Sequence, residues 1–234
     1  MQDSSCLTMP VTMLTHEEKQ QLLTRIAAFE AATGVQLVTT MLPRCDDYPE
    51  IPWKAFAAGV AFGTLIAMLS LLVPGLGVLR ALAGLTPEMP LVLVLGAGLA
   101  SGGITIAVPP AARLFLSAAR AEGEVRQTAQ ALFLEHELFK TGTRTGVLML
   151  VSAFEHRVVV LADRGLRAQL PDGAFDEVVA AMTEPLRTTA WSAAFAAGIE
   201  KLEAIVTAHG FVGRGERNTL PDHLDSHRDE GDAC

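Results

Sequence analysis

The chain has 234 residues, of which 50% are hydrophobic and 19% are charged, and its formal net charge at pH 7 is −8. Soluble domains carry about 25% charged residues, so the shortage of charge must be concentrated somewhere along the chain. An acidic chain lacks the basic footprint of a nucleic-acid-binding protein, and we exclude nucleic acid as a partner. Three widely spaced cysteines, Cys6, Cys45 and Cys234, form neither a metal motif nor a disulfide framework, which indicates free thiols.

The first elements in chain order are a helix and a strand. Thr15 and Glu18 have the spacing of a capping box, and apolar residues follow at helical intervals, which predicts a helix over residues 16–33. Residues 35–42 are rich in β-branched and apolar side chains, which predicts a strand. We expect these elements to form the first part of a soluble domain, residues 10–50.

Two long uncharged stretches follow, at residues 55–79 and 89–112. A helix of about 20 apolar residues spans the hydrocarbon core of a bilayer. Neither stretch shows the polar stripe of an ordinary soluble core helix. The sequence therefore predicts a transmembrane hairpin over residues 53–112, with spans at about 55–76 and 90–109, and the lipid bilayer as a partner.

The charges around the hairpin predict its orientation. Because the connection between the spans is short, both ends of the hairpin should lie on the same side of the membrane. The connection contains one basic residue, Arg80, whereas more basic residues lie near the outer ends of the spans: Arg44, Lys54, Arg113, Arg120 and Arg126. By the positive-inside rule, both termini and the soluble domain face the cytoplasm, at the plasma (inner) membrane.

Each predicted span carries a GxxxG motif, Gly59 with Gly63 and Gly98 with Gly102. Small residues let helix backbones approach closely in a membrane. Two interpretations stay open: the two spans pack on each other, or the glycine faces bind a second copy or other membrane proteins. Neither span contains an ionisable residue, which argues against a transporter or a channel.

The remainder of the chain completes the soluble domain. The pattern predicts a long helix over residues 113–139, two antiparallel strands at 147–154 and 158–163, and two further helices. The second part of the domain is then residues 113–210, and the polar, acidic residues 211–234 should form a disordered tail. The expected fold class is α/β: a small sheet of three or four strands, flanked by helices and interrupted by the hairpin.

Asp163 is the best candidate site residue, because it ends a predicted inner strand and α/β domains place ligand groups at strand ends. Arg144, Thr145 and Arg164 lie in loops that an antiparallel strand pair brings to the same rim. Such a cluster could bind an anion, since arginine pairs with phosphate or carboxylate groups. Alternatively, Asp163 accepts hydrogen bonds from backbone N–H groups of its own turn, or forms a structural ion pair with Arg144.

The motifs outside the hairpin resemble the TPM domain family, in a bacterial membrane-protein subgroup with a two-helix insertion. The resemblance rests on LTHEE at 14–18, TGVQLV at 33–38, TGVLMLVS at 145–152 and RVVVLADRGL at 157–166. It implies a mixed sheet with helices on both faces. Some relatives bind calcium or another divalent cation, for which Asp163 would be the ligand here, and a plant relative has been called an acid phosphatase. Relatives commonly have a Gly-x-Gly-acidic turn after this strand, which this chain lacks.

The expected function is that of a membrane-anchored TPM-like domain, a binding or regulatory module in the assembly or maintenance of membrane proteins. The alternatives are a weak divalent-metal-dependent phosphatase and a calcium-binding domain without catalysis. The sequence contains no nucleophile elbow, no HExxH motif, no P-loop and no paired carboxylates. We therefore assign no catalytic residue, and an enzyme is the less favoured interpretation.

Overall fold

A computed structural model describes residues 14–72, 89–212 and 224–226. The chain divides into two compact units, one from Met1–Pro43 with Val125–Cys234 and the other from Arg44–Glu124. We call the first the α/β unit and the second the helical unit.

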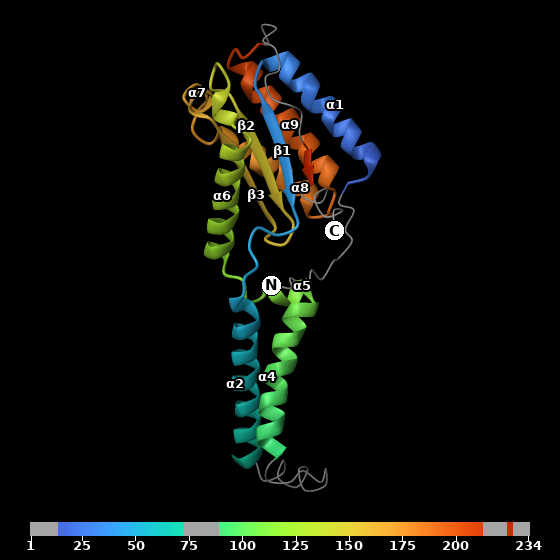
Figure 1. The fold of residues 1–234 in the computed structure, drawn as a ribbon, viewed down its shortest axis with the longest axis vertical. Helices are drawn as coiled ribbons and strands as arrows, with labels where there is room; N and C mark the ends of the chain where they lie inside the picture. Colours follow the sequence, from blue (N-terminus) through green and yellow to red (C-terminus); the bar gives the residue numbers. More distant parts are fainter. Residues whose placement is uncertain (1–13, 73–88, 213–223, 227–234) are drawn as a thin grey trace, which may run out of the picture. The chain divides into compact units, whose positions relative to one another are not determined.

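The α/β unit is built on a mixed sheet with strand order β3-β2-β1-β4 (Figure 1). The strands are β1 (Leu37–Leu42), β2 (Val147–Ser152), β3 (Arg157–Ala162) and the short β4 (Leu224–Ser226). β1 pairs in parallel with β2 and with β4, whereas β2 and β3 form an antiparallel pair. The expected antiparallel pair and the mixed α/β fold are confirmed.

β4 differs from expectation, because it lies within the segment 211–234 that we expected to be disordered. For Leu224–Ser226 this expectation is wrong, since these residues pair with Thr39, Thr40 and Met41 of β1. Pairing at a sheet edge uses backbone N–H and C=O groups, so a polar sequence does not prevent it. Residues 213–223 and 227–234 lie outside the described residues.

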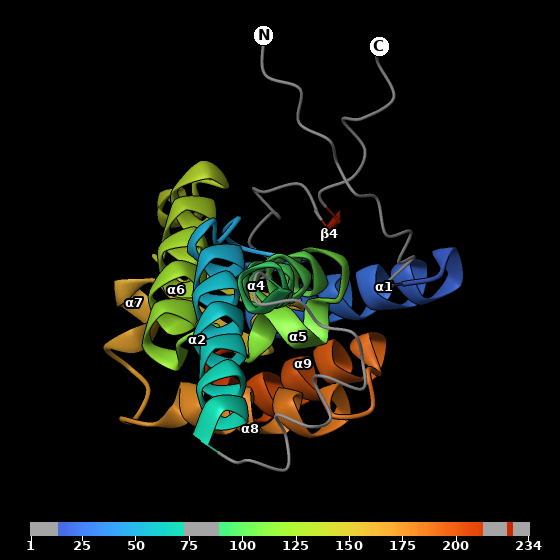
Figure 2. The same ribbon diagram turned by 90° about the horizontal axis from the view of Figure 1, so that it is seen from below.

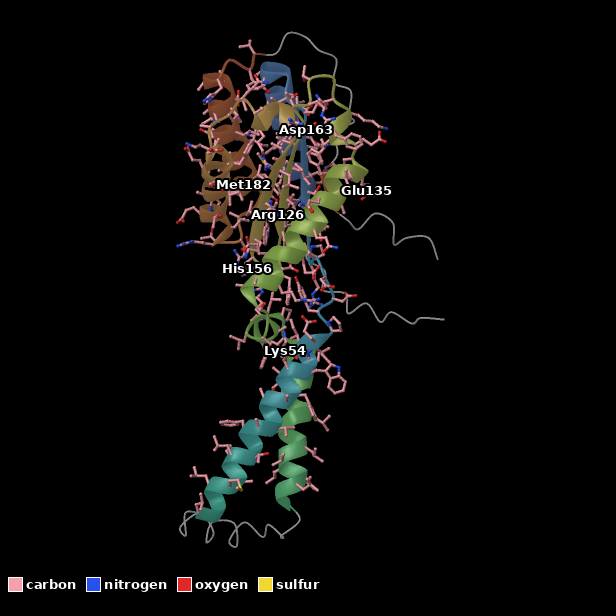
Figure 3. The ribbon with its side chains drawn as sticks, turned by 90° about the vertical axis from the view of Figure 1, so that its left-hand side faces the viewer. Lys54, Arg126, Glu135, His156, Asp163 and Met182 are labelled. Carbon is pink, nitrogen blue, oxygen red and sulfur yellow. The ribbon has the colours of Figure 1, made fainter. Side chains whose placement is uncertain are left out.

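Helices cover both faces of the sheet (Figures 1 and 3). On one face lie α1 (His16–Thr33), α8 (Ala174–Leu186) and α9 (Trp191–Ala208). Figures 1 and 2 agree in placing α8 and α9 side by side. The opposite face is covered by the part of α6 (Ala118–Glu135) that belongs to this unit.

The hydrophobic core lies between the sheet and the helices α1, α8 and α9. Alternate residues of a strand point to the same face, and this alternation directs one apolar set from each strand toward these helices. The core includes residues of β1 and β2, of α1, and of α8 and α9: Leu37, Met41, Val147, Met149, Val151, Leu22, Ile26, Phe29, Val178, Met182, Phe195 and Ile199.

The predicted helix over 113–139 is divided in the structure. It corresponds to the end of α5 (Pro109–Arg113), to α6, and to a single 3-10 turn, η1 (Leu138–Lys140). Proline at the first helical positions starts α5, because its fixed φ suits a helix start. Glu137 has φ +52°, a left-handed conformation that ends the helix before η1.

The helical unit contains two long antiparallel helices, α2 (Glu50–Leu72) and α4 (Met89–Ala107). Their direction follows from their contacts, since Gly63 lies next to Val94 whereas Gly102 lies next to Pro52. Among the described helices, α2 alone is long and apolar enough to cross a membrane by length and composition. The apolar part of α4, Leu91–Ala107, is shorter, because Val108 is extended and Pro109 starts a new helix.

Candidate functional site

Asp163 follows β3 directly and caps the short helix α7 (Arg164–Arg167). Its carboxylate oxygen Oδ1 accepts a hydrogen bond of 2.6 Å from the backbone N–H of Arg164. Its own N–H donates to the carbonyl oxygen of Gly146 at 2.8 Å. The residue is buried, and Figure 3 shows it at the opposite end of β3 from His156. This geometry is the turn cap that the sequence left open as one interpretation.

Arg144 forms an ion pair with Asp163, with 2.9 Å between Nε of Arg144 and Oδ2 of Asp163. The loop holding Arg144 is fixed by its backbone: Arg144 has φ +57°, and its carbonyl oxygen accepts from the N–H of Leu166. A β-carbon on Gly165 would lie 2.5 Å from that same oxygen, so only glycine permits this close approach. The loop and the start of α7 therefore hold the ion pair in one arrangement.

Thr145 and Arg164 contribute differently from Asp163 and Arg144. The hydroxyl of Thr145 lies 2.8 Å from that of Thr143, and its N–H donates to the Thr141 hydroxyl. The Arg164 side chain is exposed, and the backbone N–H of this residue donates to Asp163. The structure thus joins the Asp163 and Arg144 side chains, while Thr145 stabilises the loop.

The arrangement favours the structural ion pair over an open anion site. Asp163 Oδ2 is buried and accepts no directed hydrogen bond within the described residues, so Arg144 supplies its charge partner. A cation bound at Asp163 would have to displace this guanidinium. Within the described ranges, no three His, Cys, Asp or Glu side chains gather closely enough to hold a metal ion. Metal binding at Asp163 stays a prediction.

A second polar cluster, not predicted from the sequence, surrounds Arg120 in the helical unit. Its Nη2 lies 2.9 Å from Asp46 Oδ2 and 3.4 Å from Glu124 Oε1, and its Nε lies 3.0 Å from Glu50 Oε1. The guanidinium also lies 5.9 Å from the ring centre of buried Tyr48. The hydrogen bond with Asp46, followed by the charges of Glu50 and Glu124, raises the pKa of Arg120.

This cluster affects the count of basic residues from which the orientation of the hairpin was predicted. Arg120 was counted as a cation near the outer end of a span, yet three carboxylates surround it. The spacing of Arg120 and Glu124 could have indicated one pair, because residues four apart are neighbours on a helix. The contacts with Asp46 and Glu50 bridge about 70 residues of sequence, which no local pattern indicates.

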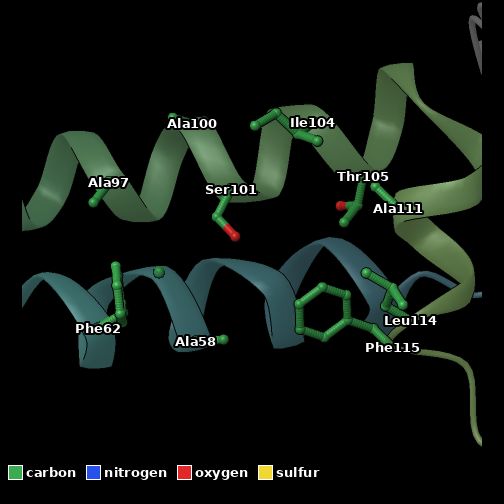
Figure 4. A pocket seen from close by; sticks show the side chains of 11 residues that line it. Ala58, Phe62, Ala97, Ala100, Ser101, Ile104, Thr105, Ala111, Leu114 and Phe115 are labelled. Atoms are coloured by element: carbon green, nitrogen blue, oxygen red, sulfur yellow. The ribbon is translucent and has the colours of Figure 1, made fainter.

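The helical unit also contains an apolar groove of about 440 Å³ between α2 and the segment from α4 to Phe115 (Figure 4). Figure 4 shows the Ser101 hydroxyl pointing from α4 toward α2. Several of the residues that line the groove are small, among them Ala58 of α2 and Ala97 of α4. Its lining includes Ala58, Phe62, Ala97, Ser101, Ile104 and Phe115.

Comparison with known proteins agrees with the fold and with the resemblance. Residues 103–205 match the family model described as the TPM domain. No curated protein was found to match the sequence. The NMR structure of the BA42 protein from the psychrophilic bacterium Bizionia argentinensis has a similar fold, with a TM-score of 0.51 at 13% identity, over 92% of this chain and 94% of that one. The region 103–205 therefore matches the TPM domain family, in agreement with the resemblance noted in the sequence.

Proposed function

We propose that the protein is a membrane-anchored TPM domain, held at the plasma membrane by the hairpin of α2 and α4. In this proposal the α/β unit is a binding or regulatory module in the assembly or maintenance of membrane proteins. The observation that carries the proposal is the outward face of the hairpin, which consists of large apolar side chains.

These side chains are exposed in a way that is unusual for a protein in water. Leu65 of α2 and Leu99 of α4 are 64% and 69% exposed, and only 11% of the apolar stretch Glu50–Leu69 is buried within the chain. Contiguous apolar patches of this kind mark membrane or partner surfaces. Because both helices run side by side with apolar residues outward, a bilayer removes the whole face from water at once.

The start of α2 has the character of a membrane interface. Trp53 is 73% exposed and packs edge-to-face on Phe56, with ring centres 6.2 Å apart. Lys54 follows directly and pairs with Glu50 at 4.0 Å. Tryptophan and lysine are enriched where a span leaves the hydrocarbon. This supports a spanning segment that enters the bilayer just after Lys54.

The orientation in our proposal is cytoplasmic for both termini. It rests on the other basic residues near the outer ends of the spans, since the charge of Arg120 is balanced by its carboxylate neighbours: Arg44, Lys54, Arg113 and Arg126. A reporter that is active only in the periplasm, joined after Cys234, should be inactive, and a fluorescent reporter that folds in the cytoplasm should be bright. The reverse pattern would contradict the orientation without affecting the anchor itself.

The anchor is tested by extraction. The full chain, expressed in a bacterial host, should remain in the membrane pellet after washing with alkaline carbonate and should be released by detergent. Release by carbonate alone would show that the apolar face binds something other than the bilayer core.

The regulatory role has its own test: deletion of the gene should lower the level of at least one membrane protein complex, and unchanged membrane protein levels would contradict that role.

A further inference from the structure

β3 is an edge strand, since it lies at one end of the strand order β3-β2-β1-β4 (Figure 1). The N–H of Asp163 donates to the carbonyl oxygen of Gly146, the residue before β2, at 2.8 Å. Because hydrogen bonding alternates along an antiparallel strand, this bond directs the odd-numbered residues of β3 toward β2. The N–H and C=O groups of Val158, Val160 and Ala162 therefore point away from the sheet, and no backbone group among the described residues bonds to them.

This outer edge of β3 is accessible and lacks the usual protection against pairing. Five of the six residues of β3 are partly exposed, whereas every residue of β1 and β2 is buried. The chain on both sides of β3 is described without a gap, over residues 89–212. Many natural edge strands carry lysine, proline or a bulge, but β3 (RVVVLA) has neither residue type and its register with β2 is continuous. The edge is therefore a template for a further strand.

The side chains of β3 indicate the chemistry of a segment that pairs there. Partly exposed apolar side chains lie on both faces of the strand: Val159 and Leu161 on one face, Val158 and Ala162 on the other. α8 packs against β3 as well. An added strand directs alternate side chains to opposite faces of the sheet. A mostly apolar segment therefore covers the exposed parts of β3 on both faces.

Arginine residues lie at both ends of β3. Arg157 begins the strand and is partly exposed, and Arg164 follows shortly after its end and is exposed. Arg144 is paired with Asp163, whereas the guanidinium groups of Arg157 and Arg164 form no ion pair within the described residues. A segment with a carboxylate at each end complements both cations, and charges at the rim of an interface favour one partner over others.

We propose that the outer edge of β3 binds an extended segment of a partner protein, which pairs antiparallel to the strand. The segment has six mostly apolar residues, the length of β3, and an acidic residue at each end, beside Arg157 and Arg164. A second copy of the chain fits the charges less well, because the carboxylate that follows its own β3, Asp163, is buried and already paired with Arg144. The inference rests on the proposed binding role of the α/β unit and not on the membrane anchor.

The test uses the full chain in detergent and a fluorescent peptide of the proposed kind, Asp-Glu-Val-Ile-Val-Thr-Val-Leu-Glu-Asp. Fluorescence anisotropy measures binding, and NMR measures hydrogen exchange of single amides. The peptide should bind and slow exchange at Val158, Val160 and Ala162, because their N–H groups face outward. Exchange at Val159 and Leu161 should not change, because their N–H groups already face β2. Only pairing along the strand produces this alternation, whereas general apolar binding does not.

Two substitutions at one position separate the backbone from the side chain. Val158→Pro removes an outward N–H and no bond to β2, whereas Val158→Thr keeps the N–H and the branched shape. Proline should weaken peptide binding about tenfold or more, and threonine should leave the affinity within about twofold. The double variant Arg157→Gln with Arg164→Gln leaves the backbone of β3 intact. It should weaken binding about tenfold at low salt, with a smaller difference at high salt.

Several outcomes would overturn the proposal. They are no binding to the wild-type chain, equal slowing of exchange at all β3 amides, and equal binding to the two Val158 variants. If the proline variant does not fold, the exchange pattern of the wild-type chain and the affinity of the glutamine variant decide instead. Slowed exchange at the outward amides when the chain alone is concentrated, with exclusion of the peptide, would identify a second copy as the occupant. Loss of peptide binding with unchanged recovery in the membrane fraction would contradict the docking edge and leave the anchor standing.

Discussion

Gly59 of α2 faces the carbonyl oxygen of Ala97 in α4 so closely that a β-carbon on Gly59 would lie 2.6 Å from that oxygen. Gly98 is equally enclosed, since its β-carbon would lie 2.7 Å from Val60. Both GxxxG motifs therefore face the partner helix of the same chain. This is the first of the two interpretations that the sequence left open, and association with a second copy stays a prediction.

Substituting Gly59 should separate the two helices. In Gly59→Ala the new methyl group meets backbone, which cannot move aside as a side-chain tip can, so we expect a loss of about 1–3 kcal/mol in hairpin stability. Thermal unfolding of the purified chain in detergent measures it. The matched control is Gly96→Ala on α4, where a β-carbon meets nothing within 4 Å and stability should not fall. Equal effects at the two positions would contradict the observed packing.

A charge on the outward face distinguishes a lipid-facing helix from one in water. Leu99→Arg places a cation at a side chain that is 69% exposed, and in a bilayer this costs roughly 2.5–3.5 kcal/mol. The variant should therefore be largely lost from the carbonate-washed membrane fraction. Leu134→Arg, at a 62% exposed position of α6, is the control and should remain at wild-type level. Wild-type membrane recovery of Leu99→Arg would count against a lipid contact there.

Asp163 should stabilise the fold in two ways, by capping α7 and by its ion pair with Arg144. Asp163→Ala removes both, and we expect a loss of roughly 1–3 kcal/mol in urea unfolding. Asp163→Asn keeps an oxygen for the N–H of Arg164 and should lose about 1 kcal/mol or less, because Arg144 is 55% exposed. Arg164→Ala, at an exposed side chain, should change stability by less than about 0.5 kcal/mol. A loss for the asparagine variant as large as for alanine would contradict the capping role.

The two activities implied by the resemblance are measurable on the full chain. In our proposal the chain does not hydrolyse a generic phosphate ester with or without divalent ions, because Asp163 is engaged by Arg144. Millimolar calcium should leave the melting temperature unchanged. Hydrolysis that disappears in Asp163→Asn would instead establish the phosphatase, and a calcium-dependent rise in melting temperature that disappears in the same variant would establish a cation site.

Acid should weaken the link between α1 and α9. Hydrogen bonds from the backbone and hydroxyl of Thr15, and then from Ser192 at 2.8 Å, hold the pKa of Glu18 below its ordinary value of 4.5. A lowered pKa in the folded state stabilises the protein above about pH 4.5, and this contribution disappears as the pH falls through the folded pKa. The melting temperatures of wild type and Glu18→Gln should therefore converge on acidification. A constant difference down to pH 3 would contradict this, and Glu17→Gln controls for charge in the same turn.

Signals carried by neighbouring residues determined a large part of this structure. The capping box of Thr15 and Glu18 and the left-handed Gly34 set the bounds of α1, which are those predicted. Hydrophobic strand patterns located β1, β2 and β3, and two uncharged stretches located α2 and α4. Each of these elements is decided by side-chain spacing and backbone preference within one segment, so the residues alone specify it.

Tertiary structure decided the rest, because it depends on residues that are distant in sequence. The pairing of β4 with β1 joins positions more than 180 residues apart through backbone groups, which carry no sequence pattern. From its own segment Arg120 has only Glu124 as a neighbour, and the contacts with Asp46 and Glu50 form only when the chain folds. Asp163 could bind a ligand or cap a turn, and the close approach of the Arg144 loop to Gly165 selects the cap and the ion pair.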